Sequence, residues 1–233
     1  MISKVIKIVL GIAVCAAISI MEAEYVLAQD GNAVAWWKFD KGGGAIANDS
    51  IGNLPGVITG AKWSKGKFGG ALKFSSINDY VNILDDPKLN TEKEITIELW
   101  VLVQKPCEYE NNIVFKPESY GIDLENGKVR FKVYVNRKYK IVCSESTIDT
   151  GAWHHIAGTY NSSSRLLALY LDGVAASTTT LMYLDSYDIN SSEYDLYVGS
   201  TTEIPPINGL IDEIKIYDHA LTNEEITKHA EWR

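Results

Sequence analysis

The chain has 233 residues, with 22 lysines and arginines against 30 aspartates and glutamates, a net charge of −8 and a pI near 5.1. Nucleic acid is not an expected partner, because neutralising phosphates needs a basic patch and the lysines here are scattered among carboxylates. An anionic membrane surface is disfavoured for the same reason.

The first 28 residues have the features of an export signal. Lys4 and Lys7 form a positive region, residues 8–20 form an apolar segment, and residues 26–28 place small side chains at the usual cleavage spacing. The apolar segment is too short to span a bilayer, which needs about 20 apolar residues. We therefore expect residues 1–28 to be a signal peptide, residues 29–233 to form one domain, and the mature protein to be secreted or periplasmic, without a membrane span.

The cysteines agree with export. Cys15 lies inside the apolar segment, so signal cleavage would remove it and leave Cys107 and Cys143. An even number of cysteines in an oxidising compartment favours a disulfide between them. The alternative is that both are buried thiols that behave as small apolar side chains.

Period-two alternation dominates the mature chain and predicts β-strands. Residues 95–103 place aliphatic side chains on one face, and residues 166–171 are apolar on both faces, which predicts a strand that is covered on both sides. Further strands are predicted at residues 34–39, 71–74, 80–83, 112–115, 120–124, 131–135, 138–142, 154–160, 196–199 and 210–217.

One helix is predicted at the end of the chain. Thr222 followed by Glu225 forms a capping box, and Lys228 and His229 lie near the C-terminal end of the helix dipole. Turn signals separate the strands, and no linker or repeat divides the chain. The sequence therefore predicts an all-β, two-sheet antiparallel sandwich with one short C-terminal helix.

Several short motifs follow one another in a definite order. They are Trp37-Lys38-Phe39-Asp40 and the motifs at residues 48–53, 66–74, 95–101, 153–160, 169–173 and 209–217. In this order they resemble the laminin-G-like, concanavalin A-like jelly-roll domains of secreted and extracellular proteins, over about residues 32–230. Such domains serve as carbohydrate-binding modules, adhesion domains or spacers, so the resemblance implies a binding role without naming the ligand.

A metal site is expected around Asp212. Period-two alternation puts this carboxylate on the same face as Ile214 and Ile216, at the rim of the core if that face is the inner one, and a buried charge must find hydrogen-bond donors or a cation. Asp49 and Asn53 offer the oxygen ligands that Ca²⁺ prefers, and the resemblance implies a structural Ca²⁺ that ties the N-terminal loop to the last strand. Asp40 is a fourth candidate ligand. The alternative is that Asp212 accepts backbone N–H bonds from that loop with no metal.

Catalysis is not expected. Some concanavalin A-like glycosidases carry Glu-x-Asp-x-Glu on one strand, which supplies the pair of carboxylates that glycoside hydrolysis needs. The matching strand here has Glu98 alone, with Thr96 and Trp100 on the same face. His154 and His155 are adjacent in a strand and point to opposite faces, so they do not converge on one ion.

Two tyrosine-rich segments are candidates for ligand binding. Residues 181–197 supply Tyr183, Tyr187 and Tyr194 together with Asp188, and Tyr109 lies in a second acidic, amide-rich segment. Tyrosine combines an apolar ring with a polar tip, which suits recognition of a sugar. The alternative is that these tyrosines cover sheet edges and turns.

Together these features favour a secreted, non-catalytic binding module that recognises a glycan and carries a structural Ca²⁺. The competing hypothesis is an extracellular protein–protein interaction module, or a structural and adhesion module of the cell envelope.

Overall fold

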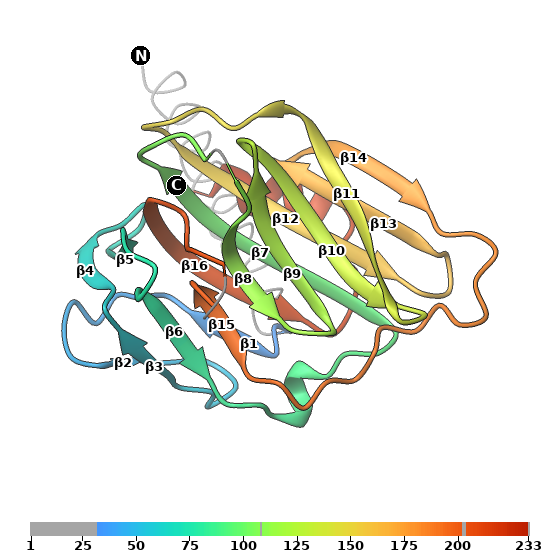
Figure 1. Ribbon diagram of the computed structural model, residues 1–233, viewed down its shortest axis with the longest axis horizontal. Helices are drawn as coiled ribbons and strands as arrows, with labels where there is room; N and C mark the ends of the chain where they lie inside the picture. Colours follow the sequence, from blue (N-terminus) through green and yellow to red (C-terminus); the bar gives the residue numbers. More distant parts are fainter. Residues whose placement is uncertain (1–31, 108, 202–203, 233) are drawn as a thin grey trace, which may run out of the picture. The chain divides into compact units, whose positions relative to one another are not determined.

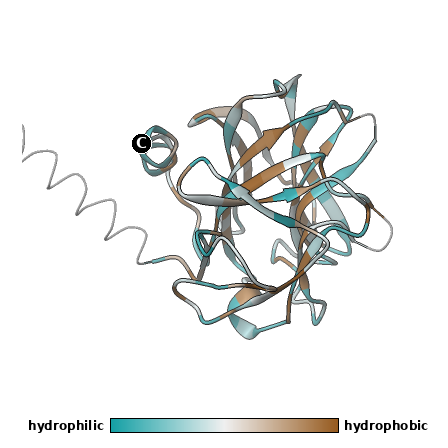
Figure 2. Ribbon diagram, turned by 90° about the vertical axis from the view of Figure 1, so that its left-hand side faces the viewer, coloured by the Kyte–Doolittle hydropathy of each residue, from teal (hydrophilic) through white to brown (hydrophobic). Residues whose placement is uncertain are grey.

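The computed structural model describes residues 32–107, 109–201 and 204–232, so the expected signal peptide lies outside the described residues. The folded unit begins at Val34 and contains two eight-stranded sheets. Figure 1 shows the strands of both sheets, and Figure 2 shows the sheets as two layers with the C-terminal helix outside one of them.

The first sheet, here called sheet A, contains the strands from the middle and the end of the chain. Its order is β14 (Val174–Thr180), β13 (Leu166–Leu171), β12 (Trp153–Asn161), β7 (Glu94–Val103), β16 (Gly209–Tyr217), β5 (Gly70–Phe74) and β4 (Lys62–Lys65), and β1 (Ala35–Trp37) also pairs with β16.

The second sheet, sheet B, has the order β11 (Lys138–Thr147), β10 (Lys128–Val135), β9 (Tyr120–Glu125), β8 (Asn111–Lys116), β15 (Leu196–Gly199), β6 (Tyr80–Ile83), β3 (Gly56–Thr59) and β2 (Ile46–Ala47). The described residues also contain a short 3₁₀ helix, η1 (Pro87–Leu89), and the helix α2 (Asn223–Glu231).

The predicted fold class is confirmed, and each predicted strand has a counterpart. The pattern did not predict β2, β3, β4 and β14. The first three have two to four residues, too few for a period to show. β14 is an edge strand in which no residue is buried, so its sequence carries no alternation of buried and exposed positions.

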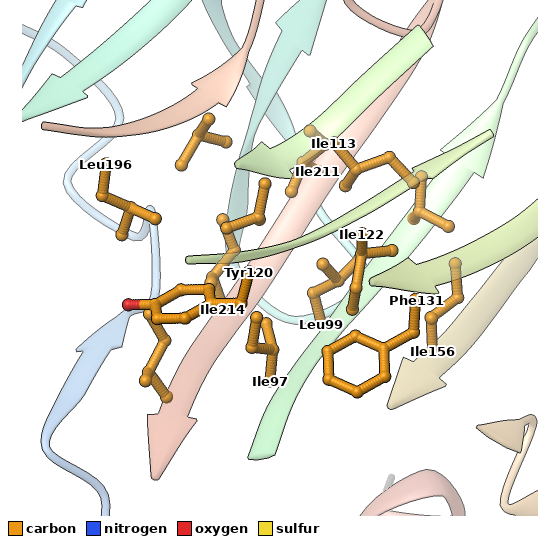
Figure 3. Packing of buried hydrophobic residues seen from close by; sticks show 14 of the residues in the cluster. Ile97, Leu99, Ile113, Tyr120, Ile122, Phe131, Ile156, Leu196, Ile211 and Ile214 are labelled. Carbon is orange, nitrogen blue, oxygen red and sulfur yellow. The ribbon is translucent and has the colours of Figure 1, made fainter. Parts of the chain in front are cut away.

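The core lies between the two sheets. The aliphatic face of residues 95–103 points into it, as predicted, and meets side chains of sheet B such as Ile122 and Phe131. Figure 3 shows this packing, with Leu99, Ile122 and Phe131 among the labelled residues. Gly158 on β12 allows the close contact of the sheets here, because a Cβ at this position would overlap the ring of Phe131.

Helix α2 packs against the outer face of sheet A. The predicted capping box is present, with Glu225 N–H donating to the hydroxyl of Thr222 and the Glu225 side chain accepting from Thr222 N–H. The hydroxyl of Thr227 donates to the carbonyl of Gly173 in the turn between β13 and β14. The helix therefore covers outer-face residues that would otherwise be exposed to water.

Candidate functional site

Asp49, one of the predicted metal ligands, organises a turn. Its Oδ1 accepts the backbone N–H groups of Trp36 (2.9 Å) and Ile51 (3.0 Å), and its Oδ2 accepts that of Leu54 (2.9 Å). Asn53 lies in the same turn with a left-handed φ of 59°. Three backbone donors already satisfy this carboxylate, which is the bonding expected of a turn-stabilising aspartate.

Asp212 and Asp40 both contact a different loop, residues 66–70. Asp212 Oδ2 accepts Phe68 N–H (3.0 Å), and Asp40 Oδ1 accepts Gly70 N–H (2.9 Å). A Cβ at Gly69 would overlap Asp40, so glycine permits this close approach. The backbone donor predicted for Asp212 is therefore present, but it comes from residues 66–70 and not from the loop around Asp49.

Asp212 has a second carboxylate, Glu213, next to it, and Lys38 and Lys215 lie near Glu213. Asp212 is fully buried, and no described residue hydrogen-bonds to its Oδ1. Burial, together with the adjacent Glu213, raises the pKa of Asp212 to about 8, although the Phe68 N–H opposes this. Burial and Asp40 raise the pKa of Glu213 to about 7, against the bond from Trp36. An orphaned buried oxygen beside two further carboxylates is a partial fit to a cation site.

The fit is only partial because of the number of ligands. Among the residues that the structure describes, no three His, Cys, Asp or Glu side chains are grouped so that they could hold a metal ion. Ca²⁺ takes six to eight oxygens, so backbone carbonyls and water would have to complete a site at Asp212.

The tyrosines predicted to bind a ligand are spread over several turns. Tyr183 is 94% exposed, and Tyr109 and Tyr194 are also exposed. Tyr187 instead lies under the guanidinium of Arg165, 4.3 Å from its ring centre, and its carbonyl accepts the hydroxyl of Tyr160. For Tyr187 these contacts match the alternative interpretation, in which a tyrosine covers a turn.

Asp188 is engaged with another residue. It forms an exposed ion pair with Lys93, with 2.6 Å between Oδ2 and Nζ. Asp188 and the predicted tyrosines therefore do not line one recognisable pocket in the described part of the chain.

Sheet B instead presents a continuous row of side chains on its outer face. Strand pairing places Val57 beside Asn82, Asn82 beside Tyr197, and Tyr197 beside Phe115. The neighbours of these residues along each strand point into the core, so the row faces outward. Four strands that are distant in sequence thus contribute to one surface.

Aromatic rings form a strip along this face. The strip consists of Tyr80, Tyr197, Phe115, Tyr139 and Tyr134. The ring centres of Tyr80 and Tyr197 are 6.4 Å apart, those of Phe115 and Tyr139 are 6.2 Å apart, and those of Tyr134 and Tyr139 are 4.8 Å apart. Each ring is half-buried, so each is held by its neighbours and still presents apolar area to solvent. We call these five residues the aromatic strip.

A pocket of about 530 Å³ lies at one end of the aromatic strip, where β3, β6 and β15 meet. It is lined by Val57, Thr59, Ile77, Asn78, Tyr80, Asn82, Tyr197, Ser200 and Thr201. This volume is in the usual range for small-molecule sites. Apolar and aromatic walls combined with amide and hydroxyl groups are the lining that a sugar ring requires.

Sequence reasoning did not single out these pocket residues. Tyr80 and Asn82 alternate with core residues Val81 and Ile83, as Tyr197 does with its neighbours. The sequence signal that could have identified the pocket was therefore the presence of aromatic and amide side chains on the solvent face of a strand.

The charged residues of this outer face pair with one another. Lys132 contacts Glu110 (2.9 Å) and Asp123 (2.6 Å), and Arg130 pairs with Glu110, Asp123 and Glu125. The ammonium of Lys132 also lies 4.4 Å from the centre of the Phe115 ring. These pairs place two cations among three carboxylates, so the cluster is slightly negative.

Glu98 lies on the other sheet and is closed off from solvent. It is 2% exposed on the outer face of sheet A, beneath helix α2. Its Oε2 lies 2.9 Å from His229 Nδ1 and 3.4 Å from His155 Nε2, and its Oε1 accepts the hydroxyl of Tyr217. Burial alone would raise the pKa of Glu98, but Lys215 and the two histidines hold it well below its usual value.

Cys107 and Cys143 are both free thiols, so the structure does not contain the predicted disulfide. Cys107 belongs to the core between the sheets. Cys143 follows the core residue Val142 on β11 and is paired with Arg130, so it points to the outer face. Sheet B separates the two sulfurs. No helix in the described residues is long and apolar enough to cross a membrane.

The two-sheet antiparallel sandwich places the chain in the class of concanavalin A-like jelly-roll domains. The family model of the concanavalin A-like lectin/glucanases superfamily matches residues 74–227, and the chain belongs to this superfamily. A comparison with curated protein sequences gave no match.

Solved structures share the fold at low sequence identity. One is domain 4 of AbnA, a GH43 extracellular arabinanase from Geobacillus stearothermophilus, in complex with arabinotriose. Its TM-score is 0.68 at 23% identity, over 86% of this chain and 98% of that one. Another is the ligand-binding domain of botulinum neurotoxin serotype D in complex with N-acetylneuraminic acid (TM-score 0.67, 17% identity, 88% of this chain and 52% of that one).

The receptor-binding domain of the botulinum neurotoxin C/D mosaic serotype is also similar, with a TM-score of 0.69 at 18% identity over 87% of this chain. The present chain spans about half the length of these toxin domains, 51% in this case. At such identities the likeness concerns the fold.

Proposed function

We propose that this protein is a non-catalytic carbohydrate-binding module that binds a glycan in the outer-face pocket of sheet B. The observation that carries the proposal is the pocket itself, in which Tyr80 and Tyr197 stand beside Asn78 and Asn82. Tyrosine rings can pack against the apolar side of a sugar, and amides can bond its hydroxyls. The aromatic strip continues from the pocket and offers further stacking positions.

The fold comparisons support this proposal. Domain 4 of AbnA, 98% of which is covered, is described as a complex with arabinotriose, so this sandwich can serve as a sugar-binding scaffold. The half-covered toxin domain is described as a complex with N-acetylneuraminic acid. The absence of catalysis belongs to the proposal and is supported by Glu98, whose carboxylate is buried and engaged by His155 and His229.

Isothermal titration with a panel of oligosaccharides tests the site. We expect Tyr197→Ala to weaken binding at least about tenfold, because losing 1.4 kcal/mol of contact energy reduces affinity tenfold. Tyr197→Phe keeps the ring and should retain most of the affinity. Tyr183→Ala, at a fully exposed tyrosine outside the pocket, is the matched control. Equal affinities of Tyr197→Ala and Tyr183→Ala would place the site elsewhere, and an absence of binding to every sugar would refute the proposal.

An interaction module is the second candidate, favoured by strand β14. This edge strand of sheet A runs Val-Ala-Ala-Ser-Thr-Thr-Thr and carries neither charge nor proline, the usual protection of an edge against strand addition. A pull-down from the cell envelope with the intact protein and with an Ala176→Pro variant would favour this candidate if a stoichiometric protein partner were lost only with the variant.

A structural Ca²⁺ at Asp212 is also proposed. Its support is the buried, unpartnered Oδ1 of Asp212 beside Asp40 and Glu213. When bound, Ca²⁺ would supply positive charge that stabilises these carboxylates in the folded state. We leave Asp49 and Asn53 out of this ligand set because Asp49 is already satisfied by backbone donors.

Thermal unfolding with Ca²⁺ and with EDTA tests this site. Ca²⁺ at a hundredfold excess over Kd should add about 2.7 kcal/mol to the free energy of unfolding. Asp212→Asn should abolish the increase, whereas Asp185→Asn at an exposed loop position should keep it. A wild-type melting temperature that is unchanged by EDTA contradicts the calcium proposal.

Export is the remaining part of the proposal and rests on residues 1–28. Expression of the full chain in a bacterial host should give a mature protein whose N-terminal sequence begins at Gln29. Recovery of the uncleaved chain in the cytoplasm would contradict export.

A further inference from the structure

We infer that the pocket on sheet B selects uncharged sugars and disfavours glycans that carry a carboxylate or sulfate near the bound residue. This inference rests on the proposed carbohydrate-binding function and specifies the class of ligand. It follows from the absence of charged side chains in the pocket lining, from carboxylates adjacent to the lining residues, and from the pairing of three cations of sheet B with carboxylates.

The lining of the pocket supplies hydrogen bonds without charge. All nine described lining residues are neutral: one valine, one isoleucine, two tyrosines, two asparagines, one serine and two threonines. Amides and hydroxyls can each donate and accept, which matches the hydroxyls of a sugar. Recognition of an anion would call for an arginine or lysine with free donors.

The charge next to the pocket residue Asn82 is negative. Asp195 accepts Asn82 Nδ2 (3.0 Å) at its Oδ2 and Asp85 N–H (3.0 Å) at its Oδ1. These bonds keep the carboxylate in place beside Asn82 and hold the amide of Asn82. Burial, with Asp195 adding to it, raises the pKa of Tyr197, so the tyrosine at the pocket wall already experiences this negative field.

A second carboxylate, that of Asp79, is adjacent in the chain to two pocket residues. Asp79 is 6% exposed, and its Oδ2 accepts the backbone N–H groups of Ser75 (2.8 Å) and Ser76 (3.0 Å). It directly precedes the pocket residue Tyr80 and follows Asn78. An anionic ligand group in the pocket would therefore approach the fixed carboxylate of Asp195, with the buried Asp79 adjacent in the chain to two lining residues, and like charges in a partly buried site repel strongly.

Three cations of sheet B are already paired. Lys116 is fully buried and pairs with Asp85 at 2.6 Å, and Lys132 and Arg130 pair with Glu110 and Asp123. To bind a ligand anion, one of these cations would have to leave a carboxylate that is itself buried or half-buried. Such an exchange leaves one charge without compensation and is unfavourable.

One acceptor at the pocket is unused by the protein. Asn82 Oδ1 has no hydrogen-bond partner among the described residues, while its Nδ2 is held by Asp195. A ligand hydroxyl could donate to this oxygen after a small movement of the side chain, whereas a carboxylate has no proton to offer. The hydrogen-bonding pattern and the electrostatic field thus favour the same ligand class.

The test compares sugars that differ in charge. Isothermal titration would use lactose against sialyllactose and α-1,4-galactotriose against trigalacturonic acid, with arabinotriose as a further neutral probe. We expect at least one neutral probe to bind and its acidic counterpart to bind at least about tenfold more weakly, with a gap that narrows as salt screens the repulsion. The affinity of the neutral probe should be unaffected by salt.

A charge substitution at the rim separates electrostatics from shape. Asn78 is exposed, so Asn78→Lys should fold normally. Because Asn78 also lines the pocket, the readout is the ratio of the two affinities: the variant should raise the affinity for the acidic probe several-fold relative to that for the neutral probe. Thr180→Lys, on the exposed edge strand of sheet A, makes the same change in net charge and should leave both affinities unchanged.

The outcomes distinguish a failure of this inference from a failure of the proposed carbohydrate-binding function. Acidic probes that bind as tightly as their neutral partners, or more tightly, overturn this inference and leave the carbohydrate-binding function standing. If no probe of either class binds, the proposed function and this inference both fail. A preference for neutral sugars that Asn78→Lys does not reduce also overturns the electrostatic basis of the inference.

Discussion

The buried carboxylate of Glu98 is expected to make a large contribution to stability, and Glu98→Gln tests this. Glutamine keeps the size of the side chain and removes its charge, which faces Lys215, His155 and His229 beneath helix α2. Removing one partner of a buried ion pair typically costs 3–5 kcal/mol. Because the glutamine oxygen can still accept a hydrogen bond from Tyr217, we expect the lower end, about 3 kcal/mol.

The effect should depend on pH in a defined direction. The pKa of Glu98 lies well below its usual value in the folded state, so the folded state favours the charged form. Its contribution to stability is complete above the pKa of the unfolded chain, near 4.5, and is lost as the pH falls through the folded pKa. The difference between wild type and variant should therefore be greatest near pH 7 and should shrink below pH 4.

Urea and thermal unfolding followed by circular dichroism measure this difference. A loss of about 3 kcal/mol corresponds to a melting temperature lower by about 6–12 °C in a domain of this size. Glu92→Gln, an exposed glutamate two residues before β7, is the control and should change little. If Glu98→Gln is as stable as Glu92→Gln at pH 7, or if its deficit does not change with pH, the reasoning about this buried cluster is refuted.

Three further predictions concern other parts of the fold. Gly158→Ala should lower the free energy of unfolding by about 1–3 kcal/mol in urea, because its Cβ would press on Phe131. Gly43→Ala, with open space around it, should leave this free energy unchanged. Equal stability of the two variants would contradict the close packing of the sheets. Asp49→Ala should lower the free energy of unfolding by about 1–3 kcal/mol both with Ca²⁺ and with EDTA, because it removes the acceptor of three backbone N–H groups. A loss of stability seen only with Ca²⁺ would show Asp49 to be a metal ligand. A reducing agent should leave the melting temperature unchanged, because Cys107 and Cys143 are free; a marked decrease would reveal a disulfide.

The fold could be predicted from the sequence because most strands have one face in the core. The alternation in residues 95–103 directly reflects burial against the opposite sheet. In residues 210–217 a bulge between Asp212 and Lys215 breaks the predicted alternation, so Asp212 pairs with Trp100 on the outer face while Ile214 and Ile216 point into the core. Strand β14 could not be predicted in this way, since its edge position leaves both faces without a periodic burial pattern.

The site was harder to predict, for a topological reason. Tyr80 and Tyr197 are distant in the chain and become neighbours only because β6 pairs with β15. Periodicity shows which face a residue occupies but does not show which strands are adjacent. The prediction of which loop contacts Asp212 was wrong for the same reason. Residues 66–70 reach β16 because they lead into β5, the strand next to it.

The position of β16 has a consequence for how the chain acquires its structure. The last strand pairs with β7, β5 and β1, so it occupies the interior of sheet A and not its edge. Until residues 209–217 have left the ribosome, β7 and β5 have no strand between them. A chain in which β16 has not yet been made therefore lacks the middle of sheet A, and we expect folding of this domain to wait for residues 209–217 and to have a slow rate set by long-range pairing.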